Sequence, residues 1–276
     1  MKNQKLVALV TGASSGIGEA TALRLLAAGY RVYGTSRQGR QAAERPYPML
    51  ALDVTDDNSV ISAVDELLRL EGQIDLLVNN AGFGVAPAAA EESSITQAQQ
   101  IFDTNFHGIV RMTRAVVPAM RRQGSGRIIN IGSILGSIAM PYVALYSASK
   151  HAVGGYSEAL DHELRTRGIR VSVVEPAFTK TKFEANNLQP DAQLDEYAKI
   201  RAKLLQVVGR AMEGGDHPDV VADVVLHAAQ ARHPKLRYTA GKTAKQLQFL
   251  RRFTPAAFLD KGIRKSLQLD NQDAAV

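Results

Sequence analysis

Short apolar runs alternate with helical patterns along the chain, and this alternation restricts the possible fold more than any other feature. Each run has the length of a strand, and the segments between them mostly have the periodicity of helices. The runs lie at residues 5–10, 31–35, 48–52, 74–79, 127–132, 169–175 and 236–239. Strands that alternate with helices form a parallel sheet covered on both faces. The sequence therefore predicts a doubly wound α/β fold with a mostly parallel, seven-stranded sheet.

The length of the chain allows one large domain or two small ones, since it has 276 residues. No Pro-, Gly- or Ser-rich linker, charge block, internal repeat or low-complexity run divides it. We therefore predict a single domain over residues 1–276. Its expected parts are a core at about 5–240, a lid segment at about 182–215 and a C-terminal extension at about 241–276.

A glycine-rich loop, TGASSGIG at residues 11–18, separates the first apolar run from a helical pattern that stops at Gly29. Glycines let the backbone turn tightly and approach a pyrophosphate, whose charge suits the N–H groups at a helix N-terminus. The spacing is GxxxGxG rather than GxGxxG. The flanking strand and helix argue against a turn without a ligand. The loop predicts a Rossmann-type dinucleotide site that includes Gly12, Ser14, Ser15, Gly16, Ile17 and Gly18.

Tyr146 and Lys150 lie four residues apart in YSASK, near the start of a helical stretch at 146–167. Residues at i and i+4 share one face of a helix. Tyrosine is a poor acid at neutral pH, and a cation ~4 Å away would lower its pKa by about three units at most. The alternative is a packed ring beside a solvated ammonium. Because the stretch follows the strand pattern that ends at Ser133, the pair predicts proton transfer to or from a carbonyl or alcohol.

Together these motifs resemble the short-chain dehydrogenase/reductase family, in the branch with chains of about 250 residues. The motifs occur in the family's order and with family-like spacing over roughly residues 5–240. They are TGASSGIG at 11–18, Asp53-Val54, Asn79-Asn80-Ala81-Gly82, Asn105, Ser133, Tyr146 with Lys150, and EPAFTKT at 175–181. By this resemblance, Asn105, Ser133, Tyr146 and Lys150 form a catalytic tetrad.

The resemblance implies a role for each member of the tetrad. Tyr146 donates its proton to a carbonyl oxygen or accepts one from an alcohol, and Ser133 bonds the same oxygen. Lys150 lowers the pKa of Tyr146 and holds the nicotinamide ribose. Asn105 holds a water that passes the proton to solvent. In isolation, Asn105 could be a helix cap and Ser133 a turn former. His107 matches no family role, and we interpret it as structural.

The end of the second strand pattern indicates which nicotinamide cofactor is bound. A carboxylate at this position binds the ribose 2′-OH of NAD, whereas an arginine accommodates the 2′-phosphate of NADP. Thr35-Ser36-Arg37 has no acid here, and Arg37 can form charge-assisted bonds to a phosphate. A solvated loop arginine is the alternative. The sequence predicts NADP(H). Beyond the loop, the expected contacts are Ser36, Arg37, Asp53, Val54, Asn79, Ala81, Gly82, Tyr146, Lys150, Pro176, Phe178, Thr179 and Thr181.

The expected substrate pocket has a mostly apolar lining. By resemblance, it lies between the segments after Gly82, after Ser133, before Tyr146 and after Pro176. An apolar lining favours a bulky hydrophobic alcohol or ketone. VYGTSR, EPAFTKT and RYTAG also resemble the 17β-hydroxysteroid and retinol dehydrogenase branch, although Ala177 stands where relatives often have glycine. The expected substrate contacts are Ser133, Leu135, Met140, Tyr142, Tyr146 and Phe183.

Two segments with helical spacing bear on whether the chain has a lid and whether it forms an oligomer. Leu188, Tyr197, Ile200, Leu204 and Leu205 have near-helical spacing, which suits a lid or a helix packed on the core. The stretch at 146–167 carries the small residues Ala148, Ala152, Gly154, Gly155 and Ala159. Relatives build dimers through this helix and the one around 105–122, so we expect a homo-oligomer, a dimer or a tetramer. Packing against the sheet of the same chain is the alternative.

The net charge is +6, and much of the basic charge is scattered or lies late in the chain, in a C-terminal extension that alternates Leu and Phe with basic residues. We favour a helix that packs its Leu/Phe face on the domain or on a partner subunit. A surface-seeking amphipathic helix is the alternative. No aromatic-rich basic patch, long apolar stretch, signal peptide or cysteine is present. We therefore expect a cytoplasmic protein with no metal, no nucleic-acid partner and no stable membrane insertion.

These patterns predict an NADP(H)-dependent oxidoreductase that interconverts a ketone or aldehyde and an alcohol on a hydrophobic small molecule. Hydride transfer would be coupled to proton transfer by Tyr146. The runner-up is a non-catalytic NADP-binding sensor on the same fold, and the intact tetrad argues against it. A membrane- or nucleic-acid-associated basic protein is the third class, supported only by the net charge and the extension.

Overall fold

The computed structural model describes residues 5–39, 45–181 and 187–269. Within these ranges, seven parallel strands form one sheet in the order β3-β2-β1-β4-β5-β6-β7. The strands are β1 Val7–Val10, β2 Arg31–Ser36, β3 Met49–Ala51, β4 Leu76–Asn79, β5 Gly126–Ile131, β6 Ile169–Pro176 and β7 Arg237–Ala240. Each predicted run overlaps one strand, so the predicted doubly wound parallel sheet is confirmed.

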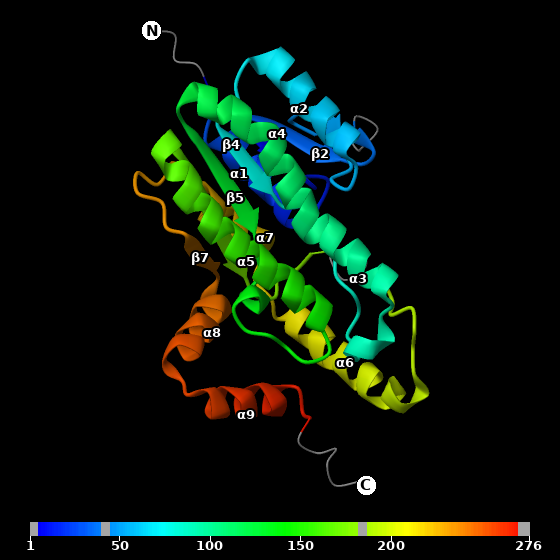
Figure 1. The fold of residues 1–276 in the computed structure, drawn as a ribbon. Helices are drawn as coiled ribbons and strands as arrows, with labels where there is room; N and C mark the ends of the chain where they lie inside the picture. The colour runs from blue at the N-terminus through cyan, green and yellow to red at the C-terminus, as the bar shows by residue number, and fades with distance from the viewer. Residues whose placement is uncertain (1–4, 40–44, 182–186, 270–276) are drawn as a thin grey trace.

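Helices cover both faces of this sheet (Figure 1). They are α1 Gly16–Ala27, α2 Asp57–Glu71, α3 Ile95–Phe102, α4 Gly108–Gln123, α5 Ala144–Leu164, α6 Ala198–Glu213, α7 Pro218–Gln230, α8 Lys242–Phe253 and α9 Ala256–Ser266. The predicted stretch at 146–167 corresponds to α5 and a short 3-10 turn that ends before Gly168. None of the helices in the described ranges combines the length and the apolar character needed to cross a membrane.

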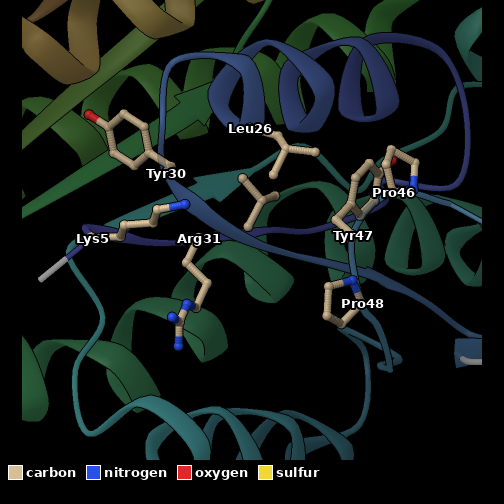
Figure 2. Close-up of a pocket in the computed structure, with 8 residues that line it drawn as sticks. Lys5, Leu26, Tyr30, Arg31, Pro46, Tyr47 and Pro48 are labelled. Atoms are coloured by element: carbon tan, nitrogen blue, oxygen red, sulfur yellow. The ribbon is translucent and has the colours of Figure 1, made fainter.

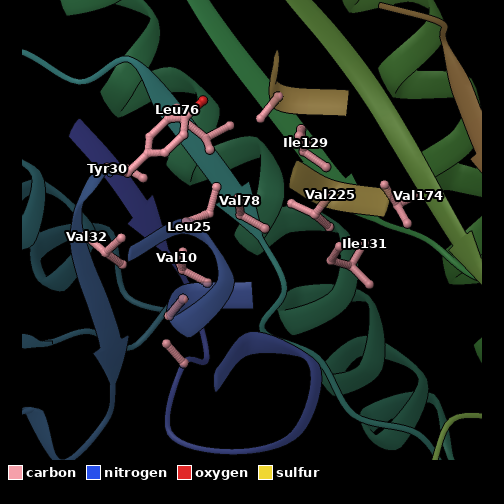
Figure 3. Close-up of a cluster of buried hydrophobic side chains, with 14 of the residues drawn as sticks. Val10, Leu25, Tyr30, Val32, Leu76, Val78, Ile129, Ile131, Val174 and Val225 are labelled. Carbon is pink, nitrogen blue, oxygen red and sulfur yellow. The ribbon is translucent and has the colours of Figure 1, made fainter. Parts of the chain in front are cut away.

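Alternating side chains of the strands divide the core into two layers. In β1, Ala8 and Val10 face the layer that contains side chains of α1 and α7. Figure 3 shows this layer, with Val10 among apolar neighbours from adjacent strands. Val7 and Leu9 face the opposite layer, which contains side chains of α2 and α4. Successive residues of a strand point to opposite faces, so a sheet buried on both faces needs the continuous apolar runs seen in the sequence.

The predicted lid segment forms α6, which packs against the end of the C-terminal extension. Ile200 and Leu204 are buried one turn apart on α6, together with Leu267 and Leu269. The expectation that Leu205 shares this face is wrong, because its side chain is 48% exposed. One residue beyond Leu204 along a helix points about 100° away. The bounds of the lid and of the single domain stay predictions.

The structure contradicts one part of the interpretation favoured for the extension. It folds into α8 and α9, of which α9 lies below α6 in the view of Figure 1. Ala244, Leu267 and Leu269 are buried, but Phe249, Phe253 and Phe258 are 61%, 62% and 71% exposed. Packing of the Leu/Phe face on the domain itself is therefore wrong, and packing on a partner subunit stays a prediction. In α8 the buried residue is Ala244, near the N-terminal end of the helix, and no residue of α9 is buried.

Candidate active site

Ser133 and Tyr146 lie together at the carboxyl ends of the strands. Ser133 lies two residues after the end of β5 and is buried, and its Oγ accepts a hydrogen bond from the Leu135 backbone N–H at 3.1 Å. Tyr146 is in the first turn of α5, and its side chain shares a hydrogen bond with Ser133. The two hydroxyl groups therefore converge on one point, as two groups that bond the same substrate oxygen must.

Lys150 lies one turn further along α5, on the same face as Tyr146. Its Nζ is 5.7 Å from the centroid of the Tyr146 ring. The side chain is buried, and Nζ donates a hydrogen bond to the Ile131 carbonyl at 2.9 Å. Burial disfavours the charged ammonium and lowers the pKa of Lys150 to about 8. The predicted pairing of ring and ammonium on one helix face is thus present.

The predicted lowering of the Tyr146 pKa is wrong for this structure. Burial raises the pKa of Tyr146 to about 12, and the hydrogen bond with Ser133 offsets this only in part. The ammonium of Lys150 is bonded to Ile131 rather than to the phenol. An electrostatic effect falls with distance, whereas desolvation acts on the whole buried ring. The i, i+4 spacing alone does not bring the cation to the oxygen.

Asn105 joins the loop after β4 to the helix before α4. It is fully buried in a π-helical turn, Asp103–His107. Its Oδ1 accepts from the Phe83 N–H at 3.0 Å, and its Nδ2 donates to the Phe83 carbonyl at 2.8 Å. Nδ2 also donates to Ser149 Oγ at 3.3 Å. The side chain therefore braces Phe83 against α5. The water-holding role predicted for Asn105 stays a prediction.

The glycine loop has the conformation that its sequence predicts. Gly12 and Gly16 have φ values of +64° and +58°, in the left-handed region that favours glycine. A Cβ on Gly18 would collide with the Gly12 carbonyl oxygen, so only glycine fits there. Ser15 caps α1 without a side-chain hydrogen bond to the helix N–H groups. The first-turn N–H groups of α1, which include Ile17, are therefore the unsatisfied donors that a pyrophosphate would fit.

Hydrogen bonds from the NNAG motif hold this loop in place. Thr11 Oγ1 accepts from the Asn80 and Ala81 N–H groups at 2.9 and 3.0 Å. Asn80 Nδ2 donates to the Thr11 and Gly12 carbonyls at 3.0 and 3.1 Å. Asn80 is thus a positioning residue that sequence reasoning did not single out. Gly82 is close to Asn105, because a Cβ on it would lie 2.9 Å from Asn105 Oδ1.

Two residues that are predicted to contact the cofactor also make contacts inside the protein. Asn79 is buried, and its Nδ2 donates to Asn130 Oδ1 at 2.8 Å, which links β4 to β5. Val54 is buried against α4, where a Cβ on Gly108 would lie 2.9 Å from Val54 Cγ2. Both side chains therefore pack inside the fold. Their predicted contacts with a cofactor stay predictions.

The segment after β6 lies beside the glycine loop. A Cβ on Gly16 would lie 3.2 Å from Thr181 Cβ, so these residues lie side by side. Pro176 ends β6, and Thr179 pairs with Asp216 in an isolated bridge. The Phe178 carbonyl accepts from the Asp216 N–H at 2.9 Å. The structure thus brings the predicted contacts after β6 to the edge that holds the glycine loop.

Charged groups lie at the end of β2, where the sequence predicts that the protein distinguishes NADP from NAD. Arg37 is exposed, and the Ser36 hydroxyl accepts from the Gly39 N–H at 3.1 Å. Burial opposes the charged form of Asp53. Hydrogen bonds from Thr55 and the positive charges of Arg37 and Arg111 outweigh this effect and lower the pKa of Asp53. Arg37 is thus close enough to Asp53 for its positive charge to favour the ionised carboxylate.

Arg45 is a second arginine beside the loop, which sequence reasoning missed. Its guanidinium donates to the Ser14 carbonyl and forms an ion pair with Glu19 of α1. Tyr47 donates from its hydroxyl to the Ala13 carbonyl at 3.0 Å. The only signal in the sequence is a basic and an aromatic residue before β3, a pattern too common to assign.

The predicted substrate residues lie in two groups. Tyr142 and Tyr146 line a small cavity with Val85, which follows β4. Tyr142 has a φ of +65°, which is strained for a bulky residue. Met140 and Tyr142 also pack against the cluster that contains Leu204. Leu135 is half-buried in the turn after Ser133. Phe183 lies outside the described residues.

The lid segment is tied to the loop after β4. Ala86 N–H donates to the Leu188 carbonyl at 2.9 Å, and Leu188 N–H donates to the Gly84 carbonyl at 3.0 Å. Glu92 is fully buried, forms an ion pair with Arg201 of α6, and accepts from the Leu194 N–H at 2.9 Å. Opening of α6 would have to break these bonds. Closure on ligand binding stays a prediction.

A larger cavity of about 130 Å³ lies away from the tetrad. Figure 2 shows it between Tyr30, Arg31, Tyr47 and Pro48. Arg31 begins β2 and Pro48 precedes β3, so this cavity is near the amino ends of the strands. Ligands of open α/β sheets bind at the carboxyl ends. The tetrad and glycine loop, rather than this cavity, form the candidate active site.

The chain matches the family described as short chain dehydrogenase over residues 6–192. It belongs to the short-chain dehydrogenase/reductase family. A 3-ketodihydrosphingosine reductase from Bacteroides thetaiotaomicron is 38% identical over 240 residues, which cover 86% of this chain and 88% of the relative. The uncharacterized oxidoreductase YusZ from Bacillus subtilis is 34% identical and covers 95% of this chain and 99% of its own.

Solved structures of short-chain dehydrogenases agree with this membership. One from Streptomyces avermitilis is 28% identical with a TM-score of 0.79 and covers 100% of this chain and 99% of its own. One from Burkholderia phymatum in complex with NAD is 28% identical with a TM-score of 0.77, and the match covers 91% of this chain and 93% of that one. One from Burkholderia cenocepacia in complex with NADP is 26% identical with a TM-score of 0.75, and the match covers 97% of this chain and 99% of that one.

Membership makes this short-chain dehydrogenase/reductase an oxidoreductase that uses a nicotinamide cofactor and acts on small-molecule alcohols or carbonyls. The predicted family is therefore confirmed. The structures of relatives hold NAD in one case and NADP in another. The nearer resemblance to 17β-hydroxysteroid and retinol dehydrogenases stays a prediction.

Proposed function

We propose that the protein is an NADP(H)-dependent reductase of ketones or aldehydes on hydrophobic small molecules. The observation that carries the proposal is the hydrogen bond between Ser133 and Tyr146, at the sheet edge that also holds the glycine loop. The chemistry that the bound cofactor supplies is hydride transfer at its nicotinamide. Ser133 would orient the substrate carbonyl oxygen, and Tyr146 would donate the proton to it.

The raised pKa of Tyr146 supports this direction of reaction. A pKa of about 12 keeps the phenol protonated at neutral pH, and the protonated form is the one that a carbonyl reduction uses. Hydride addition at the carbonyl carbon would turn its oxygen into an alkoxide, which is a much stronger base than a phenolate, so the proton moves to it readily. Lys150 would bind the ribose and, as a cation, stabilise the phenolate that remains.

Arg37 supports NADP(H) as the cofactor, because it is an exposed guanidinium at the end of β2. Arg45 adds a second positive charge beside the loop, although Glu19 neutralises part of it. The apolar side chains near Tyr142 support a hydrophobic substrate. One relative is named a 3-ketodihydrosphingosine reductase, which supports a ketone.

A homo-oligomer and a cytoplasmic location belong to the same proposal. On α5, Ala148, Gly155 and Ala159 are exposed, and a Cβ on Gly155 would meet nothing within 4 Å. Gly154 faces inward, toward Arg237. The small residues at 148, 155 and 159 thus face away from the sheet, which supports close approach of a second copy.

The Tyr146→Phe variant tests the proposed chemistry. It removes only the hydroxyl, so NADPH binding by fluorescence titration should stay at the wild-type value. Turnover of a ketone should fall roughly 10²–10⁴-fold, because general acid catalysis is lost. A Tyr156→Phe variant on the same helix is the matched control and should keep turnover. Wild-type turnover by Tyr146→Phe would contradict the assignment.

A further inference from the structure

The C-terminal extension exposes a group of large apolar side chains, here called the Phe face: Phe249, Leu250, Phe253 and Phe258. Phe249 and Phe253 lie one turn apart on α8, with ring centroids 4.7 Å apart. Phe258 follows on α9, after the turn at Thr254 and Pro255. Single exposed apolar residues are common on soluble proteins. Four within ten residues on two consecutive helices form a group that typically marks an interaction site.

The same two helices carry the excess positive charge of the protein. Residues 242–266 contain seven basic residues and one acid, Asp260. The whole chain has 33 basic and 27 acidic residues, so the remainder has 26 of each and is neutral. The Arg252 guanidinium lies 5.4 Å from the centroid of the Phe253 ring, so positive charge directly borders the Phe face.

We propose that α8 and α9 dock the protein on an anionic phospholipid surface. Phenylalanine and leucine side chains of the Phe face would enter the boundary between headgroups and acyl chains, while lysines and arginines contact lipid phosphates. Helices with exposed aromatic groups and flanking basic residues bind membranes in this way, without spanning them. The inference goes beyond the proposed function because docking requires no turnover.

Charge favours a lipid surface over a second copy of the chain. In a symmetric contact through the Phe face, the same surface of each copy would meet the other. Seven basic residues of one copy would then approach the same seven of its partner, and like charges across an interface are unfavourable. An anionic bilayer satisfies the apolar and the basic groups together.

The extension is attached to the substrate side of the molecule. Leu267 and Leu269, which follow α9, are buried against Ile200 and Leu204 of α6, next to Met140 and Tyr142. Arg251 Nε donates to the Ser137 carbonyl at 3.2 Å, close to the turn after Ser133. Docking through the Phe face would therefore hold the predicted substrate residues near the bilayer, which suits a hydrophobic substrate that partitions into lipid.

Vesicle sedimentation with the full-length protein tests the proposal. Vesicles of phosphatidylcholine alone should leave the protein in the supernatant, and vesicles that also contain phosphatidylglycerol should sediment it. High salt should weaken this binding, because it screens exposed charges. The double variant Phe253→Ser/Phe258→Ser should bind at least about tenfold more weakly. Lys261→Glu/Lys265→Glu should bind more weakly at low salt than the wild type.

Matched variants control for general effects on surface polarity and charge. Ile61→Ser/Ile95→Ser changes two other exposed apolar residues, and Arg69→Glu/Arg232→Glu reverses two other exposed charges. Both should bind vesicles as the wild type does, and thermal melts verify folding of every variant. Two results would overturn the proposal. One is a wild-type protein that ignores anionic vesicles. The other is a Phe253→Ser/Phe258→Ser variant that binds these vesicles normally but has a lower molar mass than the wild type by light scattering. That result would make the Phe face a contact between copies of the chain.

Discussion

The strand-end loops and the C-terminal extension use their side chains in opposite ways. In the loops, key polar groups are held by more than one hydrogen bond, as Thr11 Oγ1 is by two N–H groups and Asn105 by both backbone groups of Phe83. In the extension, the largest apolar side chains face solvent. The loops are therefore built to position chemistry, whereas the extension offers a surface. Variants in the two regions test this difference.

Glycine substitutions should have opposite effects in the two regions. A Cβ on Gly18 would collide with the Gly12 carbonyl, whereas a Cβ on Gly262 of α9 would meet nothing within 4 Å. Gly18→Ala should lower the free energy of unfolding by about 1–3 kcal/mol or more and abolish NADPH binding. Gly262→Ala should raise it by about 0.5–1 kcal/mol. For each variant, urea unfolding measures the free energy of unfolding and fluorescence titration measures NADPH binding. Equal effects of the two variants would contradict the comparison.

Lys150→Met should stabilise the free protein at neutral pH while it abolishes turnover. Burial lowers the Lys150 pKa from 10.5 to about 8, which corresponds to up to about 3 kcal/mol. Between these values the unfolded chain binds a proton that the folded protein lacks, so wild-type stability rises with pH in this window. The variant lacks this dependence. Its lost bond to the Ile131 carbonyl reduces the gain to about 2 kcal/mol.

Urea unfolding at pH 7 and at pH 10 measures this effect. The variant should be the more stable protein at pH 7, and its advantage should shrink toward pH 10. Lys245→Met in α8 is the matched control, because Lys245 is exposed and its removal should change little. If wild type and Lys150→Met have the same pH dependence, the buried ammonium does not destabilise the fold.

Arg37→Ala should weaken binding of NADPH about ten- to a hundred-fold, since a hydrogen bond to a charged group contributes about 1.5–3 kcal/mol. Binding of NADH should change little, because NADH has no 2′-phosphate for the guanidinium to bond. Fluorescence titration of both cofactors with wild type and variant gives the comparison. Arg69→Ala, an exposed arginine on α2, is the control. Equal weakening of NADPH and NADH would assign Arg37 a structural role.

The sheet and the glycine loop could be predicted because their signals are local. Each buried strand is a short apolar run, and the need for glycine at positions 12, 16 and 18 follows from backbone geometry. Asn80 could not be assigned in the same way, because its partners in the loop are 68 and 69 residues away in the sequence. Arg45 was missed for the same reason, since its partner Glu19 is 26 residues away.

Burial explains the predictions that were wrong. The i, i+4 spacing correctly placed Lys150 and Tyr146 on one helix face, but the pKa of Tyr146 depends on how completely the ring is desolvated and on where the ammonium points. Leu205 and the three exposed phenylalanines fit helical patterns that do not specify which residues meet a partner. Periodicity predicts a face, and tertiary contacts decide whether that face is covered.

The most direct test of the proposed reductase follows nicotinamide absorbance while the wild-type protein is mixed with NADPH and a panel of ketones and aldehydes of increasing hydrophobicity. The account predicts oxidation of NADPH that depends on both protein and carbonyl compound, is fastest with bulky apolar ketones and is slower with NADH. Tight NADPH binding without turnover of any carbonyl or alcohol in the panel would contradict it and would favour a non-catalytic NADP-binding sensor.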